Sequence, residues 1–166
     1  HAGTLDPLAS GLLVVCTGKL TKRINEIQEQ QKEYTGTFTL GATTPSYDLE
    51  TKVDQTFPIA HIKKENIRRA ANKFIGNIDQ FPPIFSALKK DGERLYEKAR
   101  RGEKVQVDAR KVHIHKFEIT RVELPEIDFR VVCSKGTYIR SLANDFGKAL
   151  NSGAHLSALC RTRIGN

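Results

Sequence analysis

Apolar and polar side chains alternate along several short stretches of this sequence. The alternation has a period of two in Tyr34–Leu40 and Val112–Ile119, which is typical of β-strands with one buried face. Two short apolar runs, Leu12–Cys16 and Ile127–Cys133, are also predicted to be strands. The pattern therefore predicts four strands that are distributed over the whole chain.

Four other stretches have the spacing of helices. In Lys64–Phe74 and Tyr138–Leu150 the apolar residues fall on one side of a helix, which predicts two amphipathic helices that pack on a core. Leu20–Gln31 is mostly polar, and Leu95–Arg101 is short and ends before Gly102. Helices and strands are mixed without a regular β-α-β alternation. We therefore predict an α+β fold with a mixed, mostly antiparallel central sheet rather than a doubly wound one.

Length and composition limit the class of protein. One domain is expected for 166 residues, and no apolar run reaches the roughly 20 residues of a membrane-spanning helix. The chain begins at His1 without a secretory leader and contains no Met, so we interpret it as an internal piece of a longer protein. Cys16, Cys133 and Cys160 lie far apart, which argues against a disulfide framework or a zinc site and favours the reducing cytoplasm. Cys16 and Cys133 lie in apolar runs and are predicted to pack in the core.

The net charge of +8 is unevenly distributed. Lys89–Lys111 contains nine basic and five acidic residues and so carries half of the excess. Such a run is commonly the solvated face of a helix with internal ion pairs. It is also the composition of an arm that binds phosphates, in which case binding would weaken steeply with salt. Composition alone leaves both interpretations open.

Two segments stand out as candidates for chemistry, whereas the common nucleotide-binding, hydrolase and zinc-protease motifs are absent. Asp6 precedes Pro7 between two glycines, which predicts a fixed, tight turn; a turn without any function is the plainer interpretation. Arg140 follows a Gly-Thr-Tyr turn where a strand meets a helix. The plainer interpretation is that the turn only caps the helix and that Arg140 is a surface residue. His113 and His115 share a strand face, but no third ligand stands beside them in the sequence, so surface histidines are expected.

Taken in order, five motifs resemble the TruB family of tRNA pseudouridine-55 synthases. They are GTLDPLASGLL, KEYTGTFTLG, SALKKDGERLYEKARRG, CSKGTYIRSLANDFG and GAHLSALCRTRIG. The resemblance implies the pseudouridine synthase fold, with residues 1–166 as the catalytic domain, incomplete at its N-terminus. It also implies isomerisation of uridine to pseudouridine in the T-loop of tRNA, without a cofactor or a metal, by a monomer that requires neither a membrane nor a protein partner.

The resemblance assigns roles to individual residues. Asp6 matches the catalytic aspartate, Arg140 the active-site arginine, and Tyr34 a tyrosine that stacks on the uracil and serves as a base at carbon 5. Asp48 matches a carboxylate that pairs with the arginine, so an Asp6–Arg140–Asp48 network is expected. Burial alone would raise the pKa of the Asp6 carboxyl, and a neighbouring guanidinium would keep it ionised. Three further residues match pocket residues of the family. Tyr138 matches a second tyrosine, Leu159 an apolar wall of the pocket, and His1 a histidine that holds the flipped conformation of the RNA.

In the family, the region of residues 82–111 is a mobile thumb that closes over the RNA. Its expected contacts are Lys89, Arg94, Tyr96 and Arg100, and phosphate contacts should dominate. The family's N-terminal segment before His1, and any C-terminal RNA-binding domain, lie outside the match. Two alternatives remain open at this point. One is a guide-RNA-dependent synthase, in which the thumb is largely reduced, and the other is an RNA-binding or RNA-folding module with incidental catalysis.

Overall fold

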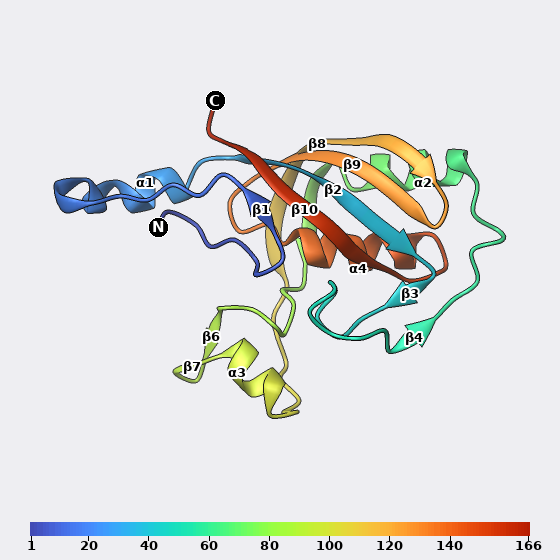
Figure 1. Ribbon diagram of the computed structural model, residues 1–166, viewed down its shortest axis with the longest axis horizontal. Coiled ribbons are helices and arrows are strands. Elements are labelled where there is room, and N and C mark those ends of the chain that lie inside the picture. The colour runs from blue at the N-terminus through green and yellow to red at the C-terminus, as the bar shows by residue number, and fades with distance from the viewer.

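The structure, a computed structural model, describes residues 1–166 and is built on one sheet of six strands (Figure 1). In spatial order the strands are β1 (Ser10–Gly11), β10 (Ala154–Ile164), β2 (Lys32–Leu40), β9 (Glu126–Cys133), β8 (Arg110–Glu123) and β5 (Gly76–Gln80). Only the short β1 runs parallel to its neighbour, β10, and every other pair is antiparallel. The sheet is therefore mixed and mostly antiparallel, and this confirms the predicted α+β class.

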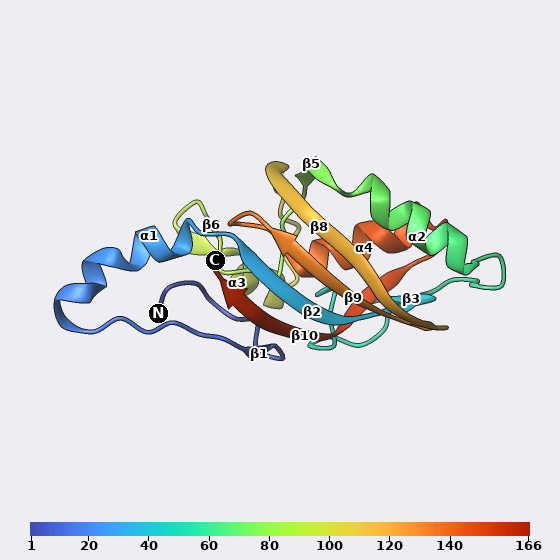
Figure 2. The same cartoon turned by 90° about the horizontal axis from the view of Figure 1, so that it is seen from above.

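Two helices cover the same face of the sheet, α2 (Lys64–Lys73) and α4 (Ile139–Ala149) (Figure 2). The core between them and the sheet is rich in phenylalanine. Phe38 of β2 stacks on Phe129 of β9 with ring centroids 4.2 Å apart, and Phe146 of α4 lies 5.5 Å from Phe38. All three side chains are buried, and they belong to one continuous hydrophobic core.

Most predicted elements are confirmed. The two amphipathic helices appear as α2 and α4, and α3 (Leu95–Arg100) matches the short predicted helix. Three of the four predicted strands lie within β2, β8 and β9. The packing explains the success, since the periodic residues of α4, such as Leu142 and Phe146, are fully buried.

The prediction of a strand at Leu12–Cys16 is wrong. The strand in this region is β1, which has two residues and ends before Leu12, and the apolar run that follows is irregular and largely exposed. Val15, for example, is 65% exposed. Cys16 is only half-buried, contrary to its predicted place in the core, whereas Cys133 is buried as predicted. An apolar run of five residues predicts burial but does not specify a hydrogen-bonding partner.

The predicted helix Leu20–Gln31 is shorter than expected and is divided. A 3₁₀ turn at Gly18–Arg23 leads into a single α-helical turn, α1 (Ile24–Gln28), and neither contains a buried residue. Figure 1 shows this segment extending sideways from the sheet. Without an apolar face on a core, little stabilises a longer helix here.

Among the strands longer than two residues, β5 and the long β10 were not predicted. Polar and charged residues such as His155 and Arg161 interrupt the period of β10, and its pairing with β2 contains two irregularities. Close packing also requires a glycine here. A Cβ added at Gly36 of β2 would lie 2.3 Å from the Ala158 carbonyl oxygen, so the two strands approach only because this residue has no side chain.

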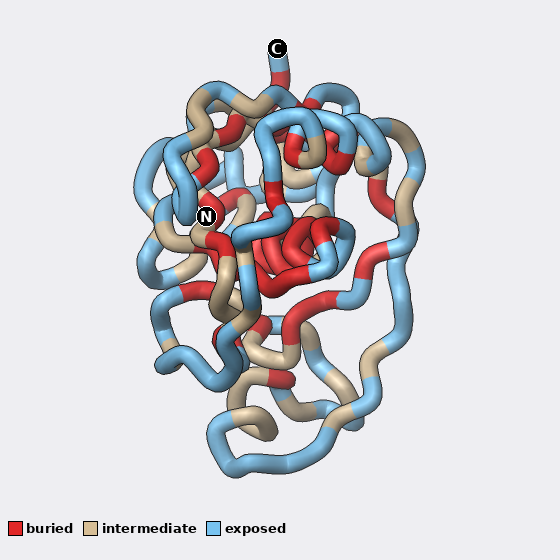
Figure 3. The backbone as a smooth tube through the Cα atoms, turned by 90° about the vertical axis from the view of Figure 1, so that its right-hand side faces the viewer, coloured by how far each residue is buried: buried red, intermediate tan, exposed pale blue.

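The basic segment forms a small projection below the sheet. It consists of a hairpin of β6 (Lys89–Lys90) and β7 (Glu93–Arg94), followed by α3. The turn between the strands is Asp91–Gly92, in which both residues have positive φ, as a two-residue hairpin turn requires. Figure 3 shows buried residues concentrated around α4, while this projection at the bottom is mostly exposed or half-buried.

A second, two-stranded sheet of β3 (Ala42–Thr43) and β4 (Gln55–Thr56) closes the loop that contains Asp48. None of the helices combines the length and the apolar character that crossing a bilayer would require.

Candidate active site

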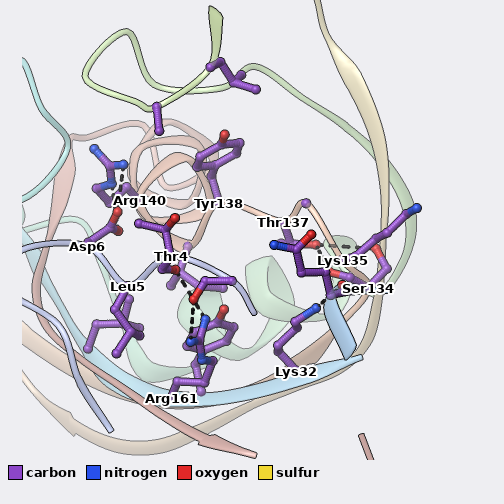
Figure 4. Close-up of a pocket in the computed structure, with 18 of the residues that line it drawn as sticks. Thr4, Leu5, Asp6, Lys32, Ser134, Lys135, Thr137, Tyr138, Arg140 and Arg161 are labelled. Carbon is purple, nitrogen blue, oxygen red and sulfur yellow. Dashed lines mark hydrogen bonds and ion pairs between the residues drawn. The ribbon is translucent and has the colours of Figure 1, made fainter. Parts of the chain in front are cut away.

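One cavity of about 490 Å³ collects five of the predicted site residues (Figure 4). They come from four different parts of the chain. Asp6 lies on the loop before β1, Tyr34 on β2 and Leu159 on β10, while Tyr138 and Arg140 lie at the start of α4. The fold thus brings together residues that are more than 100 positions apart in the sequence, as the resemblance implied.

Arg140 holds Asp6 with both arms of its guanidinium. Nε donates to Oδ2 and Nη2 to Oδ1, each at 2.9 Å. The Arg140 side chain is only 4% exposed, whereas that of Asp6 is 28% exposed and faces the cavity. Such a bidentate pair fixes the plane of the carboxylate beside the cavity. The Asp6–Arg140 contact expected from the sequence is confirmed.

The remaining donor of Arg140 binds the backbone of two other segments. Nη1 donates to the carbonyl oxygen of Phe85 at 2.6 Å and, more weakly, to that of Ser46 at 3.5 Å. Phe85 lies at the base of the projection and Ser46 in the loop between β3 and β4. The guanidinium therefore joins three loops around the carboxylate, and each loop helps to satisfy a buried charge.

The predicted extension of this network to Asp48 is wrong. No ion pair within 4.0 Å joins Asp48 to Arg140, although Asp48 is buried. Its carboxylate instead accepts hydrogen bonds from Ser46 Oγ at 2.6 Å and from the Glu50 amide at 3.0 Å. The loop's own donors therefore occupy Asp48, and its link to Arg140 runs indirectly through Ser46.

Arg161 supports the loop of Asp6 and was missed as a site residue. It is buried on β10 and donates to the carbonyls of Gly3, Thr4 and Leu12 at 3.1, 3.3 and 2.9 Å. Gly11 closes the loop with a φ of 103°, and a Cβ there would lie 2.2 Å from the Arg161 carbonyl oxygen. The sequence signal of Arg161 was weak, because it lies in an unpredicted strand that also contains His155 and Arg163.

Lys32 was also missed. It is buried on β2, two residues before Tyr34, and lines the same cavity. Its ammonium donates to the backbone carbonyls of Gln28 and Gln30, which ties the end of α1 to the sheet. Burial, together with the nearby charge of Arg161, lowers the pKa of the Lys32 ammonium.

The two pocket tyrosines are partly buried. Burial raises the pKa of the Tyr34 phenol, an effect that the nearby Arg161 cation opposes. Burial likewise raises the pKa of Tyr138. Both phenols are therefore protonated at neutral pH, and their rings form part of the cavity wall beside Asp6.

The projection contributes a second cavity of about 320 Å³ on the other side of the carboxylate. Arg94, Tyr96 and Arg100 line it together with Asp6 and Arg140. The two other residues expected to bind RNA lie elsewhere. Lys89 is on the hairpin, His1 is exposed at the start of the chain, and neither lines one of the two cavities.

No group of three or more acidic, histidine or cysteine side chains is arranged to hold a metal ion. His113 and His115 do lie side by side on β8, with ring centroids 4.5 Å apart. His113 Nδ1 is 2.7 Å from the side-chain oxygen of Asn77, so this pair belongs to the surface of the β5–β8 ladder.

Comparison with known proteins identifies the family. Residues 1–139 match the model of the TruB family pseudouridylate synthase, N-terminal domain. The chain belongs to the TruB family. Over 166 residues it is 69% identical to tRNA pseudouridine synthase B of Flavobacterium johnsoniae and 58% identical to that of Phocaeicola vulgatus. The match covers the whole chain and 72% and 71% of the two relatives.

Solved structures agree with this family assignment. The chain resembles one in a crystal structure of a Cbf5-Nop10-Gar1 complex, with a TM-score of 0.73 and 31% identity. The likeness covers 99% of this chain and 40% of that one. A second match, to an H/ACA RNP bound to a substrate RNA containing 2'-deoxyuridine, has a TM-score of 0.69 and 28% identity. The sheet, its helices and the Asp6 loop therefore form the pseudouridine synthase fold.

Proposed function

We propose that this protein converts uridine to pseudouridine at position 55, in the T-loop of tRNA. The observation that carries the proposal is the Asp6 carboxylate, fixed by Arg140 at the wall of a cavity that Tyr34 and Tyr138 also line. The TruB family and the names of the most similar relatives, tRNA pseudouridine synthase B, support it.

The reaction needs a single carboxylate. The bond from ribose carbon 1 to uracil nitrogen 1 breaks, the uracil turns, and carbon 5 bonds to ribose carbon 1, which releases the aspartate if it was bonded there. Carbon 5 then loses its proton to a base, and nitrogen 1 takes up a proton. Glycosidases that use water need a second carboxylate as general acid or base. Here no water should enter, and Asp6 either attacks the ribose or removes a ribose proton. Both routes require the anionic form that Arg140 stabilises.

The target must leave the RNA stack to reach Asp6. Flipping costs a few kcal/mol, and stacking on an aromatic ring returns about 1–3 kcal/mol of it. We assign this stacking to Tyr34, whose phenol is also the candidate base at carbon 5. Tyr138 and Leu159 form the other walls of the pocket. His1 is assigned to the RNA outside the cavity, and Asp48 to the support of the loop beneath Arg140.

We assign RNA binding outside the cavity to the thumb, residues 82–111. Its projection beside Asp6 and its positive charge support this role. Lys89, Arg94, Tyr96 and Arg100 are the proposed contacts, mainly to phosphates. The presence of the hairpin and α3 favours action without a guide RNA.

Further proposals concern the setting of the protein. We propose that it acts as a monomer in the cytoplasm without an obligate protein partner. All residues of the candidate site come from one chain, and the three cysteines are free, which suits a reducing compartment.

One assay tests the function. The full-length protein and an unmodified tRNA transcript, without guide RNA, are scored for pseudouridine in the T-loop. Asp6→Asn should bind the transcript with little loss and form no product, because the amide keeps the shape but neither attacks nor accepts a proton. Asp79→Asn, on the exposed side of β5, is the matched control and should retain activity. Product from Asp6→Asn, or none from the native protein, would contradict the proposal.

A further inference from the structure

The thumb joins the sheet through a buried glutamine. Gln80 is the last residue of β5, it directly precedes Phe81 and the thumb, and only 1% of it is exposed. It lines neither of the two cavities described above and has no part in the function proposed so far. A buried amide destabilises a fold unless its polar atoms are hydrogen-bonded, so the partners of Gln80 indicate what its side chain does.

The amide oxygen of Gln80 binds the start of helix α4. Oε1 accepts a hydrogen bond from the backbone N–H of Tyr138, the N-cap residue, at 2.7 Å. In a capping box, a glutamate or glutamine at the third helical position accepts this N–H. The third position of α4 is Ser141, whose hydroxyl binds a different group, so Gln80 supplies the acceptor from outside the helix.

Two further hydrogen bonds join the same segments. Ser141 Oγ donates to the carbonyl oxygen of Phe81 at 2.6 Å. Arg140 Nη1 donates to the carbonyl oxygen of Phe85, also at 2.6 Å. The two prolines between these carbonyls are buried and restrict the backbone, which makes the connection stiff. Residues 80–85 form the thumb base, which therefore holds the first turn of α4 at three points.

The other half of the Gln80 amide argues against a purely stabilising role. Nε2 is buried and has no hydrogen-bond partner. Leaving a buried donor unpaired costs stability, and an apolar side chain of the same shape would avoid that cost. The bond to Tyr138 offsets this cost, so the net contribution of the amide to the free energy of unfolding is small. What the amide provides is a fixed position for the first turn, which carries Tyr138 and Arg140.

We propose that Gln80 is a positioning residue for the isomerisation. Its amide fixes the N-cap of α4, and through this turn it fixes the Tyr138 ring and the guanidinium that holds Asp6. The inference rests on the proposed function and extends it to a residue that lines neither cavity. Because Gln80 is buried, RNA does not reach it, and its loss should slow the chemical step while the affinity for RNA stays unchanged.

Gln80→Met tests the role of the amide, because methionine fills a similar volume without a strong hydrogen-bond acceptor. On a T-arm stem-loop, the single-turnover rate of the full-length variant should fall about 10- to 100-fold, since displacing a reacting group by up to about 1 Å costs that much. The dissociation constant for RNA and the free energy of unfolding should change little. Gln80→Glu keeps an oxygen acceptor for the Tyr138 N–H and should restore most of the rate.

Two controls separate positioning from stability. Gln55→Met makes the same change on the exposed strand β4 and should have the native rate. Ile67→Val removes a methylene from a fully buried residue of α2, so it lowers stability outside the thumb base, and it should also have the native rate. A native rate for Gln80→Met, a loss confined to RNA affinity, or a Gln80→Glu variant that is equally slow would overturn the proposal. A Gln80→Met variant that fails to fold would overturn it too, because the amide would then be needed for stability.

Amide hydrogen exchange tests the contact without reference to product. In the protein free of RNA, the amides of residues 138–142 should exchange about tenfold faster in Gln80→Met than in the native protein or in Gln55→Met, because the Tyr138 N–H has lost its acceptor. If the native protein forms no pseudouridine, the proposed function fails, and exchange alone decides whether Gln80 fixes the start of α4. Equal exchange in the native protein and in Gln80→Met would show that it does not.

Discussion

At the scale of single residues, one guanidinium determines the geometry of the candidate site. Arg140 makes two hydrogen bonds to Asp6 and reaches the backbone of Phe85 and Ser46. A lysine has the same charge but cannot present two parallel donors to a carboxylate while also reaching a third group. The shape of the cation, and not only its charge, is therefore required.

Arg140→Lys should reduce product formation about 10²-fold, the loss expected when a reacting group moves by about 1 Å. Its affinity for RNA should change little, because Arg140 is buried beneath the cavity wall. Single-turnover rates and a binding titration measure the two effects. Arg68→Lys, on the exposed side of α2, serves as the control. Near-native turnover by Arg140→Lys would show that charge alone is sufficient.

Tyr34→Phe separates stacking from proton transfer. The variant keeps the ring, so RNA affinity should persist, while loss of a general base should slow the chemical step about 10²- to 10⁴-fold. Because burial raises the pKa of the phenol, the phenolate fraction at neutral pH is small and grows with pH. The single-turnover rate of the native protein should therefore rise from about pH 7 to about pH 10, and the variant should lack this rise. If the native protein and the variant have equal single-turnover rates and equal pH dependence, Tyr34 contributes only stacking.

Which site residues could be predicted depended on whether the resemblance gave the residue a role, since Lys32 and Arg161 also lie within its motifs. Asp6, Tyr34 and Arg140 each lie in a motif of the family, and their assembly in one cavity agrees with that prediction. Lys32 and Arg161 act through backbone carbonyls of distant segments, and such partners become visible only when the chain is folded. Asp48 shows the opposite error, because its carboxylate is occupied by hydrogen bonds within its own loop.

At the scale of elements, the predictable parts are those with a clear period and a buried face. α2, α4, β2, β8 and β9 meet this condition, and their existence was predicted correctly. β10 lies between β1 and β2 in the sheet, yet its charged residues and irregular pairing conceal the alternation. The segment after β1 is apolar without being buried, so its composition predicted a strand that does not form.

The contact between β2 and β10 also predicts a sensitive position. Gly36→Ala places a methyl group 2.3 Å from the Ala158 carbonyl and 2.9 Å from the Phe129 ring. The strands must separate, which should lower the free energy of unfolding by about 1–3 kcal/mol. Urea titration followed by circular dichroism measures this loss. Thr35→Ala, the neighbouring residue on the same strand, should cost less, and an equal cost for both would show that the close approach is unimportant.

At the scale of the whole molecule, part of the net charge of +8 comes from basic side chains that line the cavity beside Asp6. The unpaired Arg94 and Arg100 line the cavity beside Asp6, whereas other arginines of the projection and of the sheet are neutralised by acidic neighbours. We therefore expect the two interpretations of the basic segment to apply to different residues, with paired arginines such as Arg101 solvated and the unpaired Arg94 and Arg100 in contact with RNA.

The salt dependence of RNA binding tests this division. Replacing Arg94 and Arg100 together by glutamine should weaken binding and reduce the slope of log K against log salt by about 1.5 to 2. Arg68 and Arg69 of α2, both exposed, give a control with the same change in net charge. Equal slopes for the two double variants would indicate that only the total charge matters.

The contacts of Arg140 with three loops have a consequence for the order in which the site forms. The loops that contain Asp6, Ser46 and Phe85 all bind the guanidinium of Arg140, which comes later in the sequence than any of them. Until translation has delivered that residue and the loops have docked on it, the aspartate has no fixed orientation. A chain that ends before Arg140, or in which these loops have not docked, therefore lacks the fixed carboxylate that the proposed reaction needs.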